Sequence, residues 1–292
     1  MISILTATYN RASLLPELFK SLVLQIDQDF EWIVVDDGST DNTVDVLKGF
    51  VDQDVIPINW ISVPNGGKHR AINKAVNMAK GEFCFIVDSD DRLDYNAVNL
   101  INYNWNQVKN KKHYAGVVGL KALFSGEVTG TPLKYLPKRA INTDLLSYRM
   151  KYKIEGDRAE VFKTDVLKEF PFPEYENEKF CPEALVWNRI AQKYKMRYFN
   201  DIIYFCDYLP DGLTAKIVRL RCENPTASTV HYSELYHYNI PLTQKIKAAI
   251  NFWRFSFWSR NKYSELLKQI GFFQIIWMPI GYLMYKRDKK RI

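Results

Sequence analysis

Short apolar runs alternate with helical patterns over the first part of the chain, and this alternation restricts the fold more than any other feature. Strands are predicted at Ile2–Ala7, Trp32–Val35 and Ile58–Val63. After each strand, apolar residues recur at helical spacing, beginning near residues 13, 43 and 68. Successive strand–loop–helix units form a parallel, doubly wound sheet whose ligands bind at the carboxyl ends of the strands. The chain is therefore predicted to be an α/β protein with a Rossmann-like, mostly parallel sheet flanked by helices.

A fourth apolar run ends in three carboxylates, Asp88, Asp90 and Asp91, with Ser89 between the first two. The run reads as a buried strand whose carboxyl end brings these side chains together. Like charges repel unless one is protonated or a cation binds, and Mg²⁺ and Mn²⁺ prefer carboxylate oxygens. An ion held by one or two carboxylates keeps its other positions for water and phosphate oxygens, so a substrate carrying a diphosphate is the first hypothesis. The alternative is an acidic turn with no metal, because Asp is common in turns.

Polar residues also follow the other predicted strands, at Thr8–Arg11, at Asp36 and Asp37, and at Asn65–His69. The last segment contains two adjacent glycines at a helix start, where backbone N–H groups can approach a phosphate and Lys68 would add a positive charge. An ordinary tight turn is the alternative. The GxxxxGK[ST] and GxGxxG motifs are both missing here, so an ATPase or a dinucleotide-binding protein is not favoured.

The segments after the acidic cluster are less regular. The prediction is a polar helix or loop at 95–109, strands at 114–124 and 196–205, a loop-rich segment at 126–149, a short helix after residue 160 and a polar loop at 207–214. Loops of this length often shape a binding pocket, so the segment 126–149 is expected to contact a second substrate.

A further helical pattern begins at Pro182, a residue that is tolerated at the first position of a helix. Glu183 lies in its first turn, where a carboxylate complements the helix dipole, and this is the simpler explanation of that residue. Its position downstream of the acidic cluster and near Trp187, an aromatic side chain suited to stacking on a sugar, favours instead a catalytic role.

The net positive charge belongs to the end of the chain. The formal charge is +7, but residues 241–292 contain eleven Lys and Arg against two acidic residues, whereas residues 1–240 contain 29 against 31. The part that carries the acidic cluster is therefore nearly neutral, and a nucleic-acid partner is not predicted.

The cysteines and the N-terminus indicate the cytoplasm. The four cysteines lie far apart, without a CxxC pair or a histidine at zinc-finger spacing, so neither structural zinc nor a disulfide framework is predicted. The N-terminal segment has no basic n-region and its apolar run is too short for a secretory signal, so a cytoplasmic location is expected.

The last part of the chain is rich in aromatic and basic residues. The apolar stretch Ile270–Tyr285 is interrupted by a glutamine, a proline and a glycine, and it is shorter than the roughly 20 residues of a membrane-spanning helix. Aromatic residues beside Lys and Arg are typical of interfacial helices, and anionic lipid attracts the terminal basic cluster. The alternative is a helix pair packed on the rest of the protein. Residues 226–292 are predicted to form a helical, amphipathic region that associates peripherally with the inner face of the cytoplasmic membrane.

Four segments resemble the family 2 inverting glycosyltransferases with the GT-A fold, of the type that assembles bacterial surface polysaccharides. They are TATYNR at 6–11, VVDDGSTDNT at 34–43, NGGKHRAIN at 65–73 and GEFCFIVDSDD at 81–91, and their order and spacing also match. The similarity covers roughly the first 95 residues and continues more weakly to Gly212. It implies a GT-A domain at 1–225, in which residues 1–95 bind a nucleotide sugar and residues 96–225 bind the acceptor.

The resemblance implies roles in nucleotide binding. The implied nucleotide-sugar-binding residues are Thr6, Tyr9, Asp36, Asp37, Gly67, Lys68, Asp88 and Ser89. Thr6 and Tyr9 would hold and stack the base, and Asp37, with Asp36 beside it, would accept the base N–H. The loop at 65–68 would flank the nucleoside and the diphosphate.

The resemblance also implies the catalytic residues. Asp88 and Asp90 match the family's DxD motif, with Asp88 near the ribose and Asp90 as the leading ligand of Mn²⁺ or Mg²⁺. The family's general base belongs to a Glu-Asp pair, and because this chain has Pro-Glu-Ala at the corresponding position, Glu183 is the first choice. Glu178 and Asp157 are the alternatives.

The predicted function is an inverting, metal-assisted transfer of a hexose or N-acetylhexosamine from a UDP-sugar to a hydroxyl of a glycan or lipid-linked acceptor. A nucleotidyltransferase would also use paired carboxylates and a metal, and it remains an alternative. A membrane-associated protein that binds a nucleotide sugar without catalysis is the other alternative.

Overall fold

The structure is a computed structural model that describes residues 1–208, 212, 215–259 and 261–292. The chain divides into two compact units, Met1–Pro171 with Arg189–Asp207 and Phe172–Asn188 with Tyr208–Ile292. One boundary, at residue 225, was predicted, whereas the second unit also includes residues 172–188, before the strand that ends the first unit. Most of the predicted polar loop at 207–214 lies outside the described residues.

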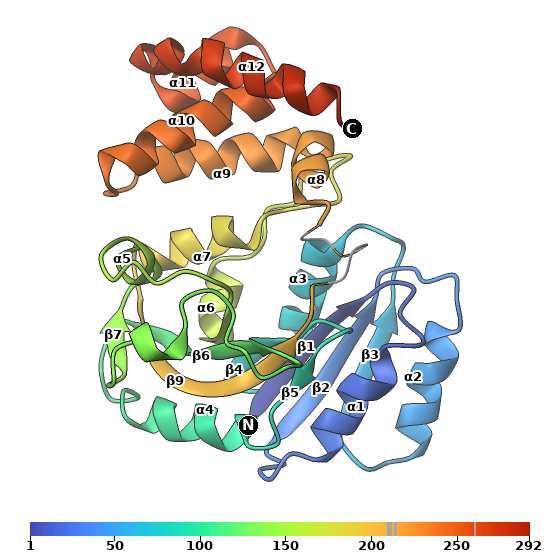
Figure 1. The fold of residues 1–292 in the computed structure, drawn as a ribbon. Helices are drawn as coiled ribbons and strands as arrows, with labels where there is room; N and C mark the ends of the chain where they lie inside the picture. Colours follow the sequence, from blue (N-terminus) through green and yellow to red (C-terminus); the bar gives the residue numbers. More distant parts are fainter. Residues whose placement is uncertain (209–211, 213–214, 260) are drawn as a thin grey trace. The chain divides into compact units, whose positions relative to one another are not determined.

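The first unit is built on one nine-stranded sheet (Figure 1). Its strands are β1 (Ile2–Thr8), β2 (Phe30–Asp36), β3 (Ile58–Ser62), β4 (Phe83–Ile86), β5 (Arg92–Leu93), β6 (Tyr114–Leu123), β7 (Ile141–Thr143), β8 (Arg158–Lys163) and β9 (Lys195–Cys206). The order across the sheet is β3-β2-β1-β4-β8-β6-β9-β5, and β7 also pairs with β9. The strands β1 to β4 are parallel, as are β6 and β9, while β5, β7 and β8 are antiparallel to their neighbours. The predicted mostly parallel α/β sheet is therefore confirmed.

Helices cover both faces of this sheet. The helices α1 (Leu15–Val23), α2 (Thr43–Asp52) and α4 (Ala97–Asn106) share a core with one face, and α3 (Lys68–Met78) and α6 (Thr164–Glu169) pack on the other. On β1 and β2, Ile2, Ile4, Trp32 and Val34 point into the first of these cores. All seven residues of β2 are buried, because a strand covered on both faces has no solvent side. The predicted helices near 13–22, 43–51 and 68–79 are confirmed, and the segment 95–109, predicted to be a helix or a loop, contains α4.

The second half of the sheet departs from the prediction. The strand β8 lies in the middle of the sheet, between β4 and β6, yet the sequence analysis expected no strand there. The predicted loop-rich segment 126–149 also contains short elements, namely η1 (Leu133–Tyr135), β7 and most of α5 (Leu145–Met150). The predicted strands at 114–124 and 196–205 and the short helix α6 are confirmed.

The connection Val87–Asp91 crosses the sheet. It joins β4 to β5, which are consecutive in sequence but separated in the sheet by β8, β6 and β9. The strand β5 pairs with the carboxyl end of β9, where Leu93 is opposite Tyr204. The acidic cluster therefore passes over the ends of the three intervening strands.

The second unit is helical, as predicted for residues 226–292. Its helices are α8 (Ile217–Glu223), α9 (Pro225–His237), α10 (Leu242–Ser256), α11 (Tyr263–Ile270), η2 (Phe272–Trp277) and α12 (Met278–Lys289), and α7 (Glu183–Ala191) begins in it. Phe252, Trp253, Leu266 and Ile270 form its apolar core. Among the described residues, no helix is both long enough and apolar enough to cross a membrane.

Two side chains tie the segment 172–188 to these helices. The Glu178 carboxylate accepts hydrogen bonds from the backbone N–H groups of Thr226 (2.6 Å) and Ala227 (2.9 Å), in the first turn of α9. The Asn224 carboxamide oxygen accepts from the backbone N–H groups of Lys179 and Phe180. These contacts explain why the segment belongs to the second unit.

Candidate active site

The loops after β1 and β2 are joined through Asn10. Its carboxamide oxygen accepts hydrogen bonds from the backbone N–H groups of Thr40 (2.7 Å) and Asp41 (3.3 Å). Its own backbone N–H donates to the Ser39 hydroxyl at 2.8 Å. The φ angle of Asn10 is 52°, a left-handed conformation that asparagine adopts more readily than most residues. The turn leaves the neighbouring Tyr9 46 % exposed at the carboxyl edge of the sheet.

Asp37 receives the N-terminus of α3. Its Oδ1 accepts a hydrogen bond from the Gly66 N–H (2.7 Å), and its Oδ2 accepts from the Gly67 N–H (2.9 Å) and the Asn65 carboxamide (3.1 Å). Gly67 has a φ of 97°, which favours glycine. The carboxylate thus complements the positive end of the helix dipole. The expectation that these two glycine N–H groups bind a phosphate is wrong for this structure, because both already bind Asp37.

Thr6 and Asp36 lie beneath the surface of the site. Both are fully buried. The Thr6 hydroxyl accepts a hydrogen bond from the Trp32 indole N–H at 3.0 Å. The Asp36 carboxylate accepts from the Ser39 backbone N–H (3.0 Å) and the Ser62 hydroxyl (2.7 Å). In this geometry both side chains stabilise the strand ends and present no surface to a ligand.

Asp88 is surrounded by positive charge. The Lys68 ammonium lies 2.6 Å from its Oδ1. Burial alone would raise the pKa of Asp88, but the charges of Lys68, Lys121 and Arg11 outweigh burial and hold this pKa below its usual value. Asp88 is therefore ionised at neutral pH.

The other two carboxylates are harder to ionise. Burial, together with the negative charge of Asp88, raises the pKa of Asp90, and the same two causes raise the pKa of Asp91 to about 7. The Tyr204 hydroxyl donates a hydrogen bond to Asp91 Oδ2 (2.5 Å) and accepts one from the Asp88 backbone N–H (3.0 Å). Ser89, between them in sequence, is buried. The connection thus holds mutually repelling carboxylates in a fixed arrangement.

This arrangement suits a divalent cation. The donors are hard carboxylate oxygens, and a cation beside Asp90 would relieve the repulsion that raises its pKa. Within the described part of the chain, no group of three or more Asp, Glu, His or Cys side chains is placed to hold a metal by itself. One or two carboxylates, with the other positions filled by water or phosphate, are sufficient for Mg²⁺. The residues therefore fit an ion that is shared with a phosphate-bearing ligand.

Sequence reasoning missed Tyr204 and Lys121. They are opposite each other on β9 and β6, and the Lys121 ammonium lies 4.1 Å from the centre of the Tyr204 ring. Tyr204 lies in an apolar run with no local sign of a polar contact. Lys121 is a charged residue within a predicted apolar strand, and that irregularity was a usable signal.

The predicted general base belongs to the second unit. Glu183 is exposed at the first position of α7. Of the alternatives, Glu178 is buried and caps α9, which argues against it as a base. Asp157 is exposed just before β8. Trp187, expected to stack on a sugar, is instead buried against Phe172 with ring centres 5.6 Å apart, so this expectation is wrong.

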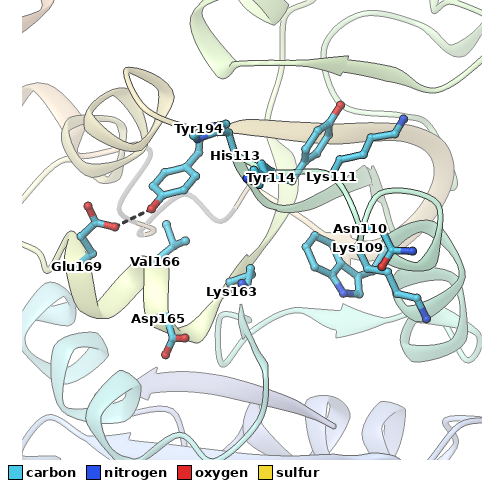
Figure 2. Close-up of a pocket in the computed structure, with 12 residues that line it drawn as sticks. Lys109, Asn110, Lys111, His113, Tyr114, Lys163, Asp165, Val166, Glu169 and Tyr194 are labelled. Atoms are coloured by element: carbon cyan, nitrogen blue, oxygen red, sulfur yellow. Dashed lines mark hydrogen bonds between the residues drawn. The ribbon is translucent and has the colours of Figure 1, made fainter.

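A separate cavity of about 340 Å³ lies at the other end of the sheet (Figure 2). It opens between the start of β6 and α6, and its lining includes Lys109, His113, Lys163 and Tyr194. The Tyr194 hydroxyl donates a hydrogen bond to Glu169 at 2.8 Å (Figure 2). Because β6 is parallel to β4, the amino end of β6 and the acidic cluster lie at opposite edges of the sheet. None of the residues predicted to form the active site lines this cavity.

Known proteins are similar to part of this chain in sequence. The model of glycosyl transferase family 2 matches residues 3–107. Glycosyltransferase GlyG of Streptococcus pneumoniae is 36 % identical over 115 residues, which are 38 % of this chain and 36 % of the relative. The poly(ribitol-phosphate) β-N-acetylglucosaminyltransferase TarS of Staphylococcus aureus is 27 % identical over 189 residues, which are 63 % of this chain and 30 % of the relative. The chain thus spans about a third of the length of these relatives.

Solved structures are similar over nearly the whole chain. The crystal structure of S. aureus TarS 1–349 in complex with UDP has a TM-score of 0.65 at 20 % identity, over 98 % of this chain and 87 % of that one. The mannosyltransferase PcManGT from Pyrobaculum calidifontis, in complex with GDP-Man and Mn²⁺, has a TM-score of 0.57 at 15 % identity, over 99 % and 87 %. This likeness confirms the GT-A fold. Residues 3–107, which include the Asp37 turn and the acidic cluster, are similar to glycosyl transferase family 2.

Proposed function

We propose that the chain is an inverting glycosyltransferase that moves a hexose or N-acetylhexosamine from a UDP-sugar to a hydroxyl of a glycan or lipid-linked acceptor. The observation that carries this proposal is the acidic cluster at the carboxyl edge of the sheet. There Lys68, Lys121 and Arg11 keep Asp88 ionised beside the more weakly acidic Asp90. Basic side chains can bind a diphosphate and carboxylates can bind a divalent ion, so the two ligands can be held at one place. The UDP complex of TarS supports uridine as the nucleoside.

The base of the nucleotide is assigned to Tyr9 and Asp37. Tyr9 is exposed and can stack on a base. Asp37 Oδ1 accepts one hydrogen bond from protein and so retains a lone pair for a base N–H. Thr6 and Asp36 stabilise the strand ends. The Lys68 ammonium, which is paired with Asp88 in this structure, leaves that carboxylate and binds the diphosphate.

The metal is assigned to Asp90, with Asp88 as the second ligand or the partner of the ribose. Mn²⁺ or Mg²⁺ fits these oxygen donors, and the Mn²⁺ complex of PcManGT supports a divalent ion. Held there, such an ion would neutralise charge on the leaving diphosphate. Lys68 and Lys121 supply further positive charge to the same group.

The reaction is assigned to a single displacement. The Glu183 carboxylate removes the proton of the acceptor hydroxyl, whose oxygen attacks the anomeric carbon as the bond to the diphosphate breaks. Attack opposite the leaving group inverts the anomeric configuration. The acceptor is bound by residues 96–225, and the helical end of the chain keeps the enzyme at the inner face of the cytoplasmic membrane, where a lipid-linked acceptor is found.

The test is UDP release and sugar transfer by the purified chain with a panel of UDP-sugars and Mn²⁺. Glu183→Gln is expected to lower transfer by about 100-fold or more, the contribution typical of a positioned acid or base. Asp90→Asn removes the charge of the leading metal ligand and is also expected to lower transfer. Asp52→Asn and Glu265→Gln are matched controls, because both residues are exposed and outside the residues assigned to the donor, the metal, the base and the acceptor, and they should leave activity unchanged.

Three outcomes contradict parts of the proposal. Full activity of Glu183→Gln would remove that residue as the base. Turnover in excess chelator would show that the reaction needs no metal ion. Release of pyrophosphate in place of UDP would indicate nucleotidyl transfer.

A further inference from the structure

Two contacts fix the orientation of α12 against α10. A Cβ atom on Gly281 would lie 2.6 Å from Trp253 Cβ and 2.9 Å from the Arg254 backbone nitrogen, so only glycine allows this close approach. Asp288 is buried and accepts two hydrogen bonds from the Arg254 guanidinium. Gly281 and Asp288 are seven residues apart, which places them on one face of the helix. The opposite face is therefore turned away from α10.

That opposite face and the preceding turn are apolar and exposed. We name as the apolar stripe the side chains of Phe272, Phe273, Ile276, Ile280 and Leu283. Their exposed fractions run from 43 % at Ile280 to 84 % at Phe273. From Phe273 onward they recur at spacings of three and four residues, which align side chains along a helix. Apolar groups gathered in this way indicate a site of interaction.

Basic residues follow directly after the stripe. The five exposed cations are Lys286, Arg287, Lys289, Lys290 and Arg291. The one acidic residue among them, Asp288, is already paired with Arg254. The cations are therefore not neutralised by a neighbouring carboxylate in this segment. The twelve residues of α12 extend about 18 Å, which is less than the roughly 30 Å of a bilayer's hydrocarbon core.

We propose that the apolar stripe inserts into the headgroup region of an anionic bilayer while the cations that follow it bind acidic lipid headgroups. An apolar face continuous with a basic end is typical of helices that lie in the membrane surface. Lysine is depleted in the cores of protein–protein interfaces, so the three lysines among these cations favour lipid over a protein partner. The inference rests on the proposed function in taking the membrane as the place of the acceptor.

The experiment is co-sedimentation of the full chain with phosphatidylcholine vesicles, with and without phosphatidylglycerol. Binding is expected only with phosphatidylglycerol and should weaken as salt is added. Phe273→Ser is expected to weaken binding about tenfold to hundredfold, since burial of such a side chain contributes roughly 1.5–3 kcal/mol. Lys290→Gln should weaken it about fivefold, equivalent to about 1 kcal/mol per cation near an anionic surface. The matched controls Tyr135→Ser and Lys112→Gln change exposed residues of the first unit and should bind as the unaltered chain does.

Several results would overturn the inference. It fails if the unaltered chain does not sediment with anionic vesicles, or if it binds neutral and anionic vesicles equally. It also fails if Phe273→Ser converts a dimer into a monomer without affecting vesicle binding, because the stripe would then join two copies of the chain. UDP release measured without vesicles separates this inference from the proposed function. Intact release with no vesicle binding refutes the membrane surface alone, and vesicle binding without transfer refutes the enzyme alone.

Discussion

Replacing Tyr204 with phenylalanine removes one hydroxyl from beneath the acidic cluster and tests how that cluster is held. The hydroxyl donates to the Asp91 carboxylate and accepts from the Asp88 backbone N–H. The rest of the ring is fully buried beside Phe85, with ring centres 6.0 Å apart, so phenylalanine fits the same space. The substitution therefore deletes two hydrogen bonds and little packing.

The expected loss of stability is large for a single oxygen atom. A hydrogen bond to a charged group contributes about 1.5–3 kcal/mol, and a buried N–H left without an acceptor costs about 1–3 kcal/mol. Because the two effects overlap in one network, we expect Tyr204→Phe to lower the free energy of unfolding by about 2–5 kcal/mol. The measurement should be made at a pH well above the pKa of Asp91, which burial raises to about 7, so that the carboxylate is charged.

The assay is urea unfolding of the full chain, and Tyr198→Phe is the matched control. Tyr198 is also buried on β9, but among the described residues its hydroxyl has no hydrogen-bond partner. Its ring stacks on Tyr148 with centres 3.7 Å apart, a contact that phenylalanine keeps. Tyr198→Phe should change the free energy of unfolding by no more than about 0.5 kcal/mol, or raise it. Equal losses in the two variants would refute the reasoning, since burial alone would then explain both.

Three further substitutions test other parts of the structure. Gly81→Ala places a Cβ atom 2.7 Å from the Ser3 backbone nitrogen, and this overpacking should cost about 1–3 kcal/mol in urea unfolding; an unchanged midpoint would contradict the close approach. Asp288→Ala leaves the Arg254 guanidinium buried without its carboxylate and should cost about 3–5 kcal/mol, measured by thermal unfolding of the helical signal. Burial lowers the pKa of His231 to about 3, so between pH 6.5 and 3 the unfolded chain binds a proton that the folded chain does not. On acidification, stability should therefore fall by about 1.4 kcal/mol per pH unit more in the unaltered chain than in His231→Gln. Asp91, whose raised pKa acts in the opposite direction, affects both proteins alike, and equal slopes would refute the assignment.

The first half of the sheet was predictable because its signals are local. The strands β1 and β2 are rich in β-branched or aromatic residues, and each is followed by a polar turn and a helical pattern. The sequence located Asp37 and the helix start at Gly67 correctly as features of the carboxyl edge. It did not reveal that the carboxylate binds the helix N-terminus, because the two groups are 30 residues apart and only the parallel pairing of β2 and β3 brings them together.

The remaining features depend on contacts that the local sequence does not express. The strand β8 mixes three charged and three apolar residues over only six positions, and its place between β4 and β6 decides its conformation. The partner of Asp91 is 113 residues away at Tyr204. Trp187 is an amphipathic side chain in isolation, and only its contact with Phe172 shows that it is part of a core.

The connection Val87–Asp91 also affects how binding energy is distributed through the first unit. It spans from the interior strand β4 to the edge strand β5, so the carboxylates belong to a link between two distant parts of the sheet. A ligand that immobilises this link would restrain β9 through the pairing of Leu93 with Tyr204, and β1 through the Val87 N–H, which donates to the Leu5 carbonyl at 2.9 Å. When the donor binds, amide exchange is therefore expected to slow in β1 and β9, which lie on either side of β4, β8 and β6, as well as in the residues that contact the ligand.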